Sequence, residues 1–291
     1  MTATSLVQTL WTYTHTAPWR GLAQTRERGL TLAWDARHTL HLFNRRGQPQ
    51  AQWPCPGELT AAACADDGSS FAAVGAQGEV WLLSPDLTVR QEHRVSTRAA
   101  AVALEAFGRR IAVADGEGTL YLLDRQGNSV WQALNPRPLR HLAFVPEQAR
   151  LIVSADFGLV ACYDDAGRCV WRDGLVAHAG SLAVSGDGTV VVLACFSEGV
   201  CIYRNNDPKT RRFLPDTAPA HRVALSYDGM TILTTDRESL VVWGGADGTF
   251  CRQLKCEAQP LALALDALGE RAVVAFADGR LSALAPVDPA H

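Results

Sequence analysis

Lysine is nearly absent from this chain of 291 residues. Lys209 and Lys255 are the only two lysines, so 25 of the 27 basic residues are arginines. Genome base composition is the simplest cause of such a bias. The alternative is that some of these arginines serve as planar donors to carboxylate or phosphate groups. The formal net charge is only -3, which gives no overall attraction to nucleic acid or to an anionic membrane surface.

Long apolar runs and export signals are also missing. No run of eighteen apolar residues occurs, so we expect no membrane-spanning helix. The N-terminal segment has neither the positive start nor the apolar block of a secretory signal peptide. Eight cysteines are scattered without a Cys-x-x-Cys pair, and several lie in apolar runs, where a free thiol behaves as a small hydrophobe. These features predict a reducing, cytoplasmic location without a disulfide framework.

The usual catalytic motifs are absent. The sequence contains neither Gly-x-Ser-x-Gly nor His-Glu-x-x-His, and neither lysine lies in a phosphate-binding loop. The eight histidines show no metal-ligand spacing along the chain. The segments expected nearest the molecular axis are mostly Ala, Leu and Val, without the convergent carboxylates that calcium needs. We therefore predict no catalytic residue, no cofactor and no metal, and a protein that is not an enzyme.

What the sequence contains instead is one unit repeated every forty residues. The stretch IAVADGEGTLYLLD at 111–124 reads as strand, tight turn and strand, and 71–84 and 151–164 repeat this pattern. First strands begin near 21, 61, 101, 141, 181, 221 and 261, and second strands follow ten residues later in each unit. Third strands end near 43, 83, 123, 163, 203, 243 and 283. A unit of this kind cannot bury both faces alone, so it needs copies of itself as neighbours.

Seven such units predict an all-β fold, a seven-bladed β-propeller of four-stranded antiparallel blades. Closure into a ring removes the open edges that a stack of sheets would leave. An open β-solenoid would have shorter rungs, and a two-sheet sandwich would not keep one period seven times. We expect one domain over residues 1–291, with blades near 18–57, 58–97, 98–137, 138–177, 178–217, 218–257, and 258–288 plus 5–16.

The outer strands predict how the ring closes. They fall near 51, 91, 131, 171, 211 and 251, so the seventh copy would fall at 291, where the chain stops. Seven periods earlier the sequence reads Leu10-Trp11, which matches the Val-Trp pairs at Trp131 and Trp171. The N-terminal segment, roughly Ser5 to Thr16, should therefore supply the outer strand of the last blade.

These residues resemble the WD40-repeat family over nearly the whole chain. The family's Trp-Asp at the end of the third strand appears in reduced form as Leu123-Asp124, Tyr163-Asp164 and Trp243-Gly244. Its Gly-His before the first strand is reduced to hints at His178-Ala-Gly180 and Ala220-His221. The outer strands at 127–131 and 167–171, with Gly-x-x-x-Trp, also look like PQQ-type propeller repeats. The resemblance implies a rigid platform for protein partners.

One rim of the predicted ring gathers arginine and aromatic residues. Its loops join each fourth strand to the next first strand and each second strand to its third strand. The candidate partner-binding residues are Trp19, Arg20, Arg37, Arg98, Arg137, Arg140, Phe157, His178, Phe196, His221, Arg222 and Arg237. The acids expected there are fewer, namely Glu58, Glu117 and Asp278. The simpler interpretation is a solvated rim of an arginine-rich protein.

Arginine and aromatic side chains dominate binding hot spots, and clustered arginine suits acidic segments. The leading hypothesis is therefore a non-enzymatic interaction subunit of a multiprotein assembly, whose rim binds an acidic or extended segment of a partner protein. Nucleic acid fits poorly, because no aromatic interleaving follows a strand face. A propeller enzyme, or a receptor for a small ligand or metal in the central channel, is the alternative. An oligomeric structural protein is a third possibility.

Overall fold

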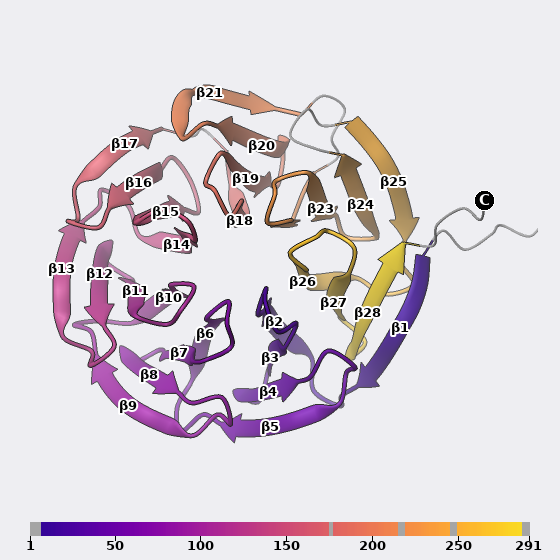
Figure 1. The fold of residues 1–291 in the computed structure, drawn as a ribbon, viewed down its shortest axis with the longest axis horizontal. Coiled ribbons are helices and arrows are strands. Elements are labelled where there is room, and N and C mark those ends of the chain that lie inside the picture. Colours follow the sequence, from indigo (N-terminus) through magenta and orange to yellow (C-terminus); the bar gives the residue numbers. More distant parts are fainter. Residues whose placement is uncertain (1–6, 175–176, 215–218, 245–248, 287–291) are drawn as a thin grey trace, which may run out of the picture.

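The computed structural model describes residues 7–174, 177–214, 219–244 and 249–286. These residues form seven four-stranded antiparallel sheets, arranged as blades around a central axis (Figure 1). The all-β, seven-bladed propeller predicted from the repeat is therefore confirmed. Within the described segments, no helix is long and apolar enough to cross a membrane.

Each blade runs outward from the axis in sequence order. The innermost strands are β2 (Trp19–Gln24), β6 (Leu59–Cys64), β10 (Ala99–Leu104), β14 (Leu139–Val145), β18 (Ala179–Val184), β22 (Arg222–Leu225) and β26 (Pro260–Leu265). The second strands are β3 (Thr31–Asp35), β7 (Phe71–Gly75), β11 (Arg110–Asp115), β15 (Arg150–Ala155), β19 (Val190–Cys195), β23 (Thr231–Thr235) and β27 (Ala272–Phe276). The third strands are β4 (Thr39–Phe43), β8 (Glu79–Leu83), β12 (Thr119–Asp124), β16 (Val160–Asp164), β20 (Gly199–Arg204), β24 (Ser239–Gly244) and β28 (Arg280–Pro286). We number the blades 1 to 7 by these inner strands.

The outer strands are β5 (Pro49–Pro54), β9 (Val89–Arg94), β13 (Ser129–Leu134), β17 (Cys169–Asp173), β21 (Asp207–Phe213), β25 (Thr249–Lys255) and β1 (Val7–Thr14). The last of these comes from the N-terminus and pairs antiparallel with β28 along its whole length. The predicted ring closure is thus confirmed, although Ser5 and Leu6 lie outside the described residues.

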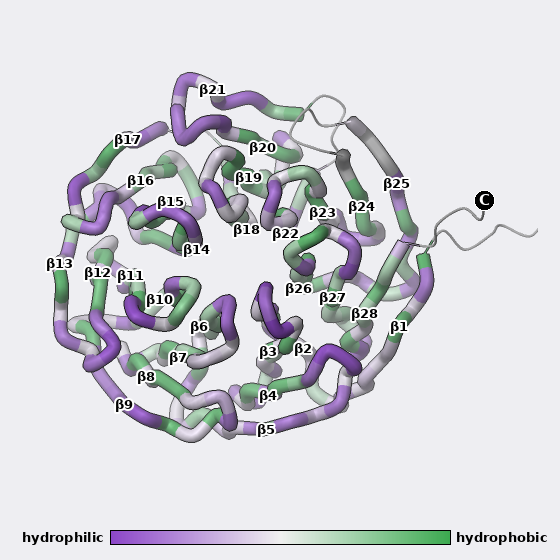
Figure 2. The backbone as a smooth tube through the Cα atoms, in the orientation of Figure 1, coloured by the Kyte–Doolittle hydropathy of each residue, from purple (hydrophilic) through white to green (hydrophobic). Residues whose placement is uncertain are grey.

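Burial follows the position of a strand within its blade. The second and third strands are almost entirely buried, whereas outer strands such as β5 and β9 alternate between exposed and half-buried residues. Figure 2 shows the same gradient, with hydrophilic residues frequent along the outer strands and in the turns. Small residues allow the inner strands to converge near the axis, where β10 with its three successive alanines contacts both β6 and β14.

Tryptophans of the outer strands fill the spaces between blades. Trp131 stacks on Tyr163 with ring centroids 5.9 Å apart, and Trp171 stacks on Tyr203 at 5.8 Å. Trp11 of β1 stacks in the same way on Phe43 at 6.5 Å, across the seam between blades 7 and 1. The turn beneath Trp11 requires glycine, because Gly47 has a φ of 77° and an added Cβ would clash with the indole ring. The closing strand therefore uses the same packing device as the covalently continuous blades.

Candidate functional site

The predicted rim exists as one face of the ring, formed by the fourth-to-first and second-to-third loops. Eight of the candidate residues are exposed there: Arg20, Arg37, Arg98, Arg137, Arg140, His178, Phe196 and Arg237. Phe157, His221 and Arg222 are half-buried. Trp19 is only 1% exposed, so it is not available to a partner. It lies in the seam between blades 1 and 7 and donates its indole N–H to the carbonyl of Gly279 at 2.9 Å.

Blades 4 to 6 bring several candidate residues into contact. Phe157 follows β15 and forms a β-bridge with His178, and their rings lie 4.7 Å apart. The Arg137 guanidinium lies over the Phe157 ring, 5.7 Å from its centroid. One blade further on, Phe196 follows β19 and its ring lies 5.1 Å from that of His221. The same Phe–His ring contact therefore occurs twice, on adjacent blades.

The second pair borders an open groove. Phe196, His221, Asp236, Arg237 and their neighbours line this groove, which has a volume of about 670 Å³. Burial lowers the pKa of His221, and the nearby Arg237 and Arg222 lower it further. The imidazole is therefore neutral at neutral pH and adds an aromatic face rather than a charge. Phe196 is 39% exposed, which leaves a ring available at the groove wall.

Two other arginines of the predicted set are engaged within the protein. Arg222 donates from Nη1 to the carbonyls of Gly180 and His221, at 3.1 and 2.9 Å, and burial lowers its pKa. Arg140 forms an exposed ion pair with Asp156 at 3.3 Å. The rim also carries more acids than the sequence led us to expect. Beyond the three predicted, its loops include Asp156, Glu198, Asp236, Glu238 and Glu257.

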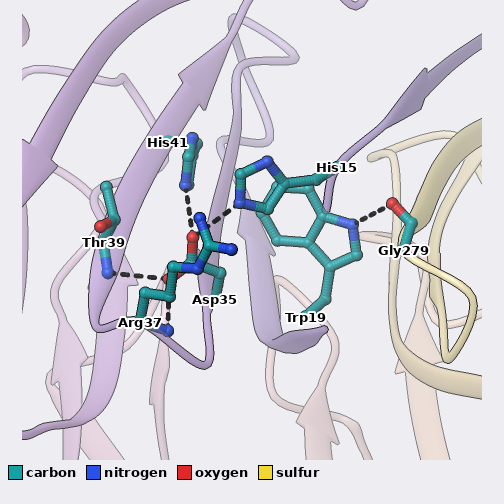
Figure 3. Close-up of polar contacts among 7 residues, drawn as sticks. All are labelled: His15, Trp19, Asp35, Arg37, Thr39, His41 and Gly279. Carbon is teal, nitrogen blue, oxygen red and sulfur yellow. Dashed lines mark hydrogen bonds and ion pairs between the residues drawn. The ribbon is translucent and has the colours of Figure 1, made fainter. Parts of the chain in front are cut away.

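A second cluster on this face lies at the closing seam and is centred on Asp35 (Figure 3). Asp35 ends β3 and is 2% exposed. Its Oδ1 accepts the backbone N–H groups of Arg37 and Thr39, at 2.8 and 3.0 Å. Its Oδ2 lies 2.8 Å from Nε2 of His15 and 3.0 Å from Nε2 of His41. Because His15 follows the closing strand β1, these contacts tie blade 7 to blade 1. We call Asp35, His15 and His41 the seam cluster.

The seam cluster has a defined charge state. Burial alone would raise the pKa of Asp35, but the hydrogen bonds from Thr39, the two imidazoles and Arg37 outweigh it and hold the pKa below its usual value. Burial lowers the pKa of His41, against the opposing effect of Asp35. At neutral pH the arrangement is thus a carboxylate that accepts an N–H from a neutral His41. The two histidines of the seam cluster are 26 positions apart in the sequence.

The charge state predicts a pH dependence. The stability that the Asp35 carboxylate contributes is present above the pKa of an unfolded aspartate, about 3.9, and is lost as pH falls through the lower folded value. In EDTA, the difference in thermal midpoint between wild type and Asp35→Asn should not shrink between neutral pH and about pH 5, because Asp35 also favours protonation of His41, and it should shrink below about pH 4. Thermal melts across this range measure it. A difference that shrinks above pH 5 would contradict the lowered pKa.

Asp115 of blade 3 occupies the equivalent position without histidines. Its Oδ1 accepts the N–H groups of Glu117 and Thr119, at 3.0 and 2.8 Å. Its Oδ2 accepts hydroxyl hydrogen bonds from Tyr121 and Ser96, at 3.2 and 3.4 Å. Through these contacts the aspartate stabilises the tight turn after the second strand. No sequence motif indicates the seam cluster, because the repeat places His15 in the closing segment of blade 7 and His41 in the third strand of blade 1.

A side chain spans the axis at the opposite face. Arg26 lies in the first turn of blade 1 and donates from Nη2 to the carbonyl of Val184 in blade 5, at 3.1 Å. Its guanidinium also lies 5.6 Å from the ring of Tyr227 in blade 6 and 3.9 Å from a carboxylate oxygen of Asp66 in blade 2. Burial raises the pKa of Asp66, and Arg26 opposes this. The inner turns of distant blades are thereby joined.

Comparison with known families matches residues 116–288 to the PQQ-type repeat family described as outer membrane protein assembly factor BamB. No curated protein sequence matches the chain. The match agrees with the PQQ-type character expected from the outer strands, and the WD40 part of the resemblance stays a prediction. Because the matched residues make up more than half of the chain and lie in a seven-bladed propeller, the protein belongs to this BamB-like family of PQQ-type propellers.

Proposed function

We propose that the protein is a non-enzymatic interaction subunit of a multiprotein assembly, in which the rim of blades 4 to 6 binds an acidic, extended segment of a partner protein. The family description, an assembly factor, supports a role of this kind. The WD40-like use of a propeller as a rigid platform fits the same proposal. The observation that carries it is the repeated Phe–His pair on adjacent blades, flanked by exposed Arg137 and Arg237.

The chemistry of this surface favours an extended peptide with carboxylates. Guanidinium groups bind carboxylates through two parallel N–H donors, and flat rings supply contact area at little conformational cost. Two similar pairs on successive blades offer two successive contact points to one segment. Asp236 and Glu238 at the groove would repel a strongly acidic segment there. The carboxylates of the partner segment should therefore lie opposite the guanidinium groups of the rim.

Charge reversal at the rim tests the proposal. Arg137→Glu combined with Arg237→Glu should weaken partner binding at least about tenfold, because central arginines carry a large share of interface energy. Wild-type binding should also weaken with added salt. Affinity purification with mass spectrometry identifies the partner, and titration by calorimetry then compares the variants. Arg125→Glu, an exposed residue in a turn at the opposite face, is the matched control.

Two results would count against the rim. One is recovery of no specific partner by the wild-type protein, and the other is unchanged affinity in the double variant while the fold is intact by circular dichroism. Equal loss in the Arg125→Glu control would show a general charge effect rather than a rim site. A partner that proves to be a nucleic acid would contradict the proposed class.

The proposed location is a reducing, cytoplasmic compartment. All seven cysteines whose side chains the structure describes are free thiols. Burial raises the pKa of Cys162 to about 11 and of Cys201 to about 12, so these thiols are protonated and unreactive at neutral pH. Cell fractionation with an antibody to the protein tests the location directly, and recovery in an oxidising compartment would overturn it.

A further inference from the structure

We propose that the seam cluster binds a divalent transition-metal ion, with Zn²⁺ as the fitting ion, through Nε2 of His15, Nε2 of His41 and Oδ2 of Asp35. These three ligand atoms lie within 4.8 Å of one another. Two imidazoles and one carboxylate are a donor set that suits zinc, and such a three-ligand set leaves a coordination position for water. In the part of the chain that the structure describes, no other group of three such residues comes together in this way.

The surroundings of the cluster orient the donors. The Asp35 carboxylate cannot turn freely, because its Oδ1 is held by the N–H groups of Arg37 and Thr39. Its other oxygen is thereby directed at both imidazoles. The Trp19 ring packs 5.1 Å from His15 and 5.3 Å from His41, which restricts both imidazole rings. Hydrogen bonds to the metal ligands, such as those that Arg37 and Thr39 donate to Asp35, are a common requirement of zinc sites.

Metal binding would change the protons at the cluster. In the structure the imidazole Nε2 atoms face a carboxylate oxygen, so each carries its proton there when neutral. When Nε2 of a neutral ring becomes a ligand, its proton moves to Nδ1. Nδ1 of His41 is buried without a hydrogen-bond partner. That missing partner costs about 10- to 100-fold in affinity, so we expect binding in the micromolar range.

The site also has a route to solvent and a structural consequence. The His15 side chain is 17% exposed, whereas those of Asp35 and His41 are almost fully buried, so an ion would enter on the His15 side. A bound ion would join the segment after β1 to two strands of blade 1. It would therefore stabilise the ring closure, and its binding should raise the thermal midpoint as the ion concentration rises.

Metal binding to the purified full chain tests the proposal. Metal-free protein at pH 7.5 is titrated with Co²⁺, followed by visible ligand-field absorption, and with Zn²⁺, followed by calorimetry and thermal melts. We expect one ion per chain and a midpoint that rises with ion concentration. His15→Gln keeps an amide donor near Asp35 but removes a ligand, and it should bind at least about 100-fold more weakly, since loss of an outer-shell partner alone costs up to that factor.

Matched controls separate the site from adventitious binding. Asp115→Asn alters the equivalent carboxylate position without imidazoles, and His178→Gln removes an exposed histidine of the rim. Both should bind like wild type. The proposal is overturned if the wild-type protein shows no saturable binding, or if His15→Gln binds as tightly as wild type. If His15→Gln does not fold, X-ray absorption of the Zn²⁺-loaded wild type decides, because any ligand count other than two imidazoles contradicts the site.

Discussion

Asp35→Ala should lower the free energy of unfolding by about 3–5 kcal/mol. The substitution removes the acceptor of two backbone N–H groups and two imidazoles at a site that is 2% exposed. Each buried donor left without a partner costs about 1–3 kcal/mol, and the total is reduced where water reaches His15. Urea unfolding of the metal-free protein, followed by tryptophan fluorescence, gives the measurement.

Asp115→Ala is the comparison that isolates the seam. It removes the same two turn hydrogen bonds in blade 3, but its side-chain partners Ser96 and Tyr121 are more accessible to water. We expect a loss of about 2 kcal/mol there. The difference between the two variants measures how much more the histidines contribute at the closing seam than Ser96 and Tyr121 contribute in blade 3. Equal losses would mean that the contacts of Asp35 with His15 and His41 add nothing beyond those two hydroxyl hydrogen bonds.

Removal of residues 1–16 should abolish cooperative folding. The deletion takes away β1, exposes the edge of β28, and removes the stacking of Trp11 on Phe43 and the edge-on contact of Tyr13 with Phe43. It also removes His15, whose backbone N–H donates to the carbonyl of Gly279 at 3.0 Å. An uncovered apolar edge strand is a template for aggregation. We expect the shortened chain to be largely insoluble, with no sharp thermal transition.

A circular permutant supplies the control for that deletion. A chain that starts at Ala17 and carries residues 1–16 after His291, joined by a flexible linker, has the same residues in the same blade. Its thermal midpoint should lie within a few degrees of wild type, because linker entropy changes slowly with length. Differential scanning calorimetry compares the two. A folded deletion mutant, or an unfolded permutant, would contradict the closure described for β1.

Periodicity explains why the fold could be predicted and the site only in part. The forty-residue spacing gave the position of each strand within its blade, and the offset at Leu10-Trp11 identified the closing strand. A repeat position does not determine which way a side chain points. Trp19 was therefore assigned to the rim, whereas its ring is packed in the seam against Gly279. The same limit applied to Arg222, whose guanidinium binds carbonyls within the protein.

Pairing between blades was the other missing information. His15 and His41 meet around Asp35 because the loop between β1 and β2 packs against blade 1, so no local motif signals them. The Phe–His pairs were in the predicted set because both members are in rim loops, but their contacts follow from the way adjacent blades pack. Acids in the same loops offset part of the positive charge of the rim, as the ion pair of Arg140 with Asp156 shows.

The reach of Arg26 has a mechanical consequence. Repeat proteins whose units touch only their neighbours tend to come apart one unit at a time. In this ring the Arg26 guanidinium of blade 1 contacts blades 2, 5 and 6. When the two termini are pulled apart by force, the blades should therefore unfold in one abrupt step rather than one after another.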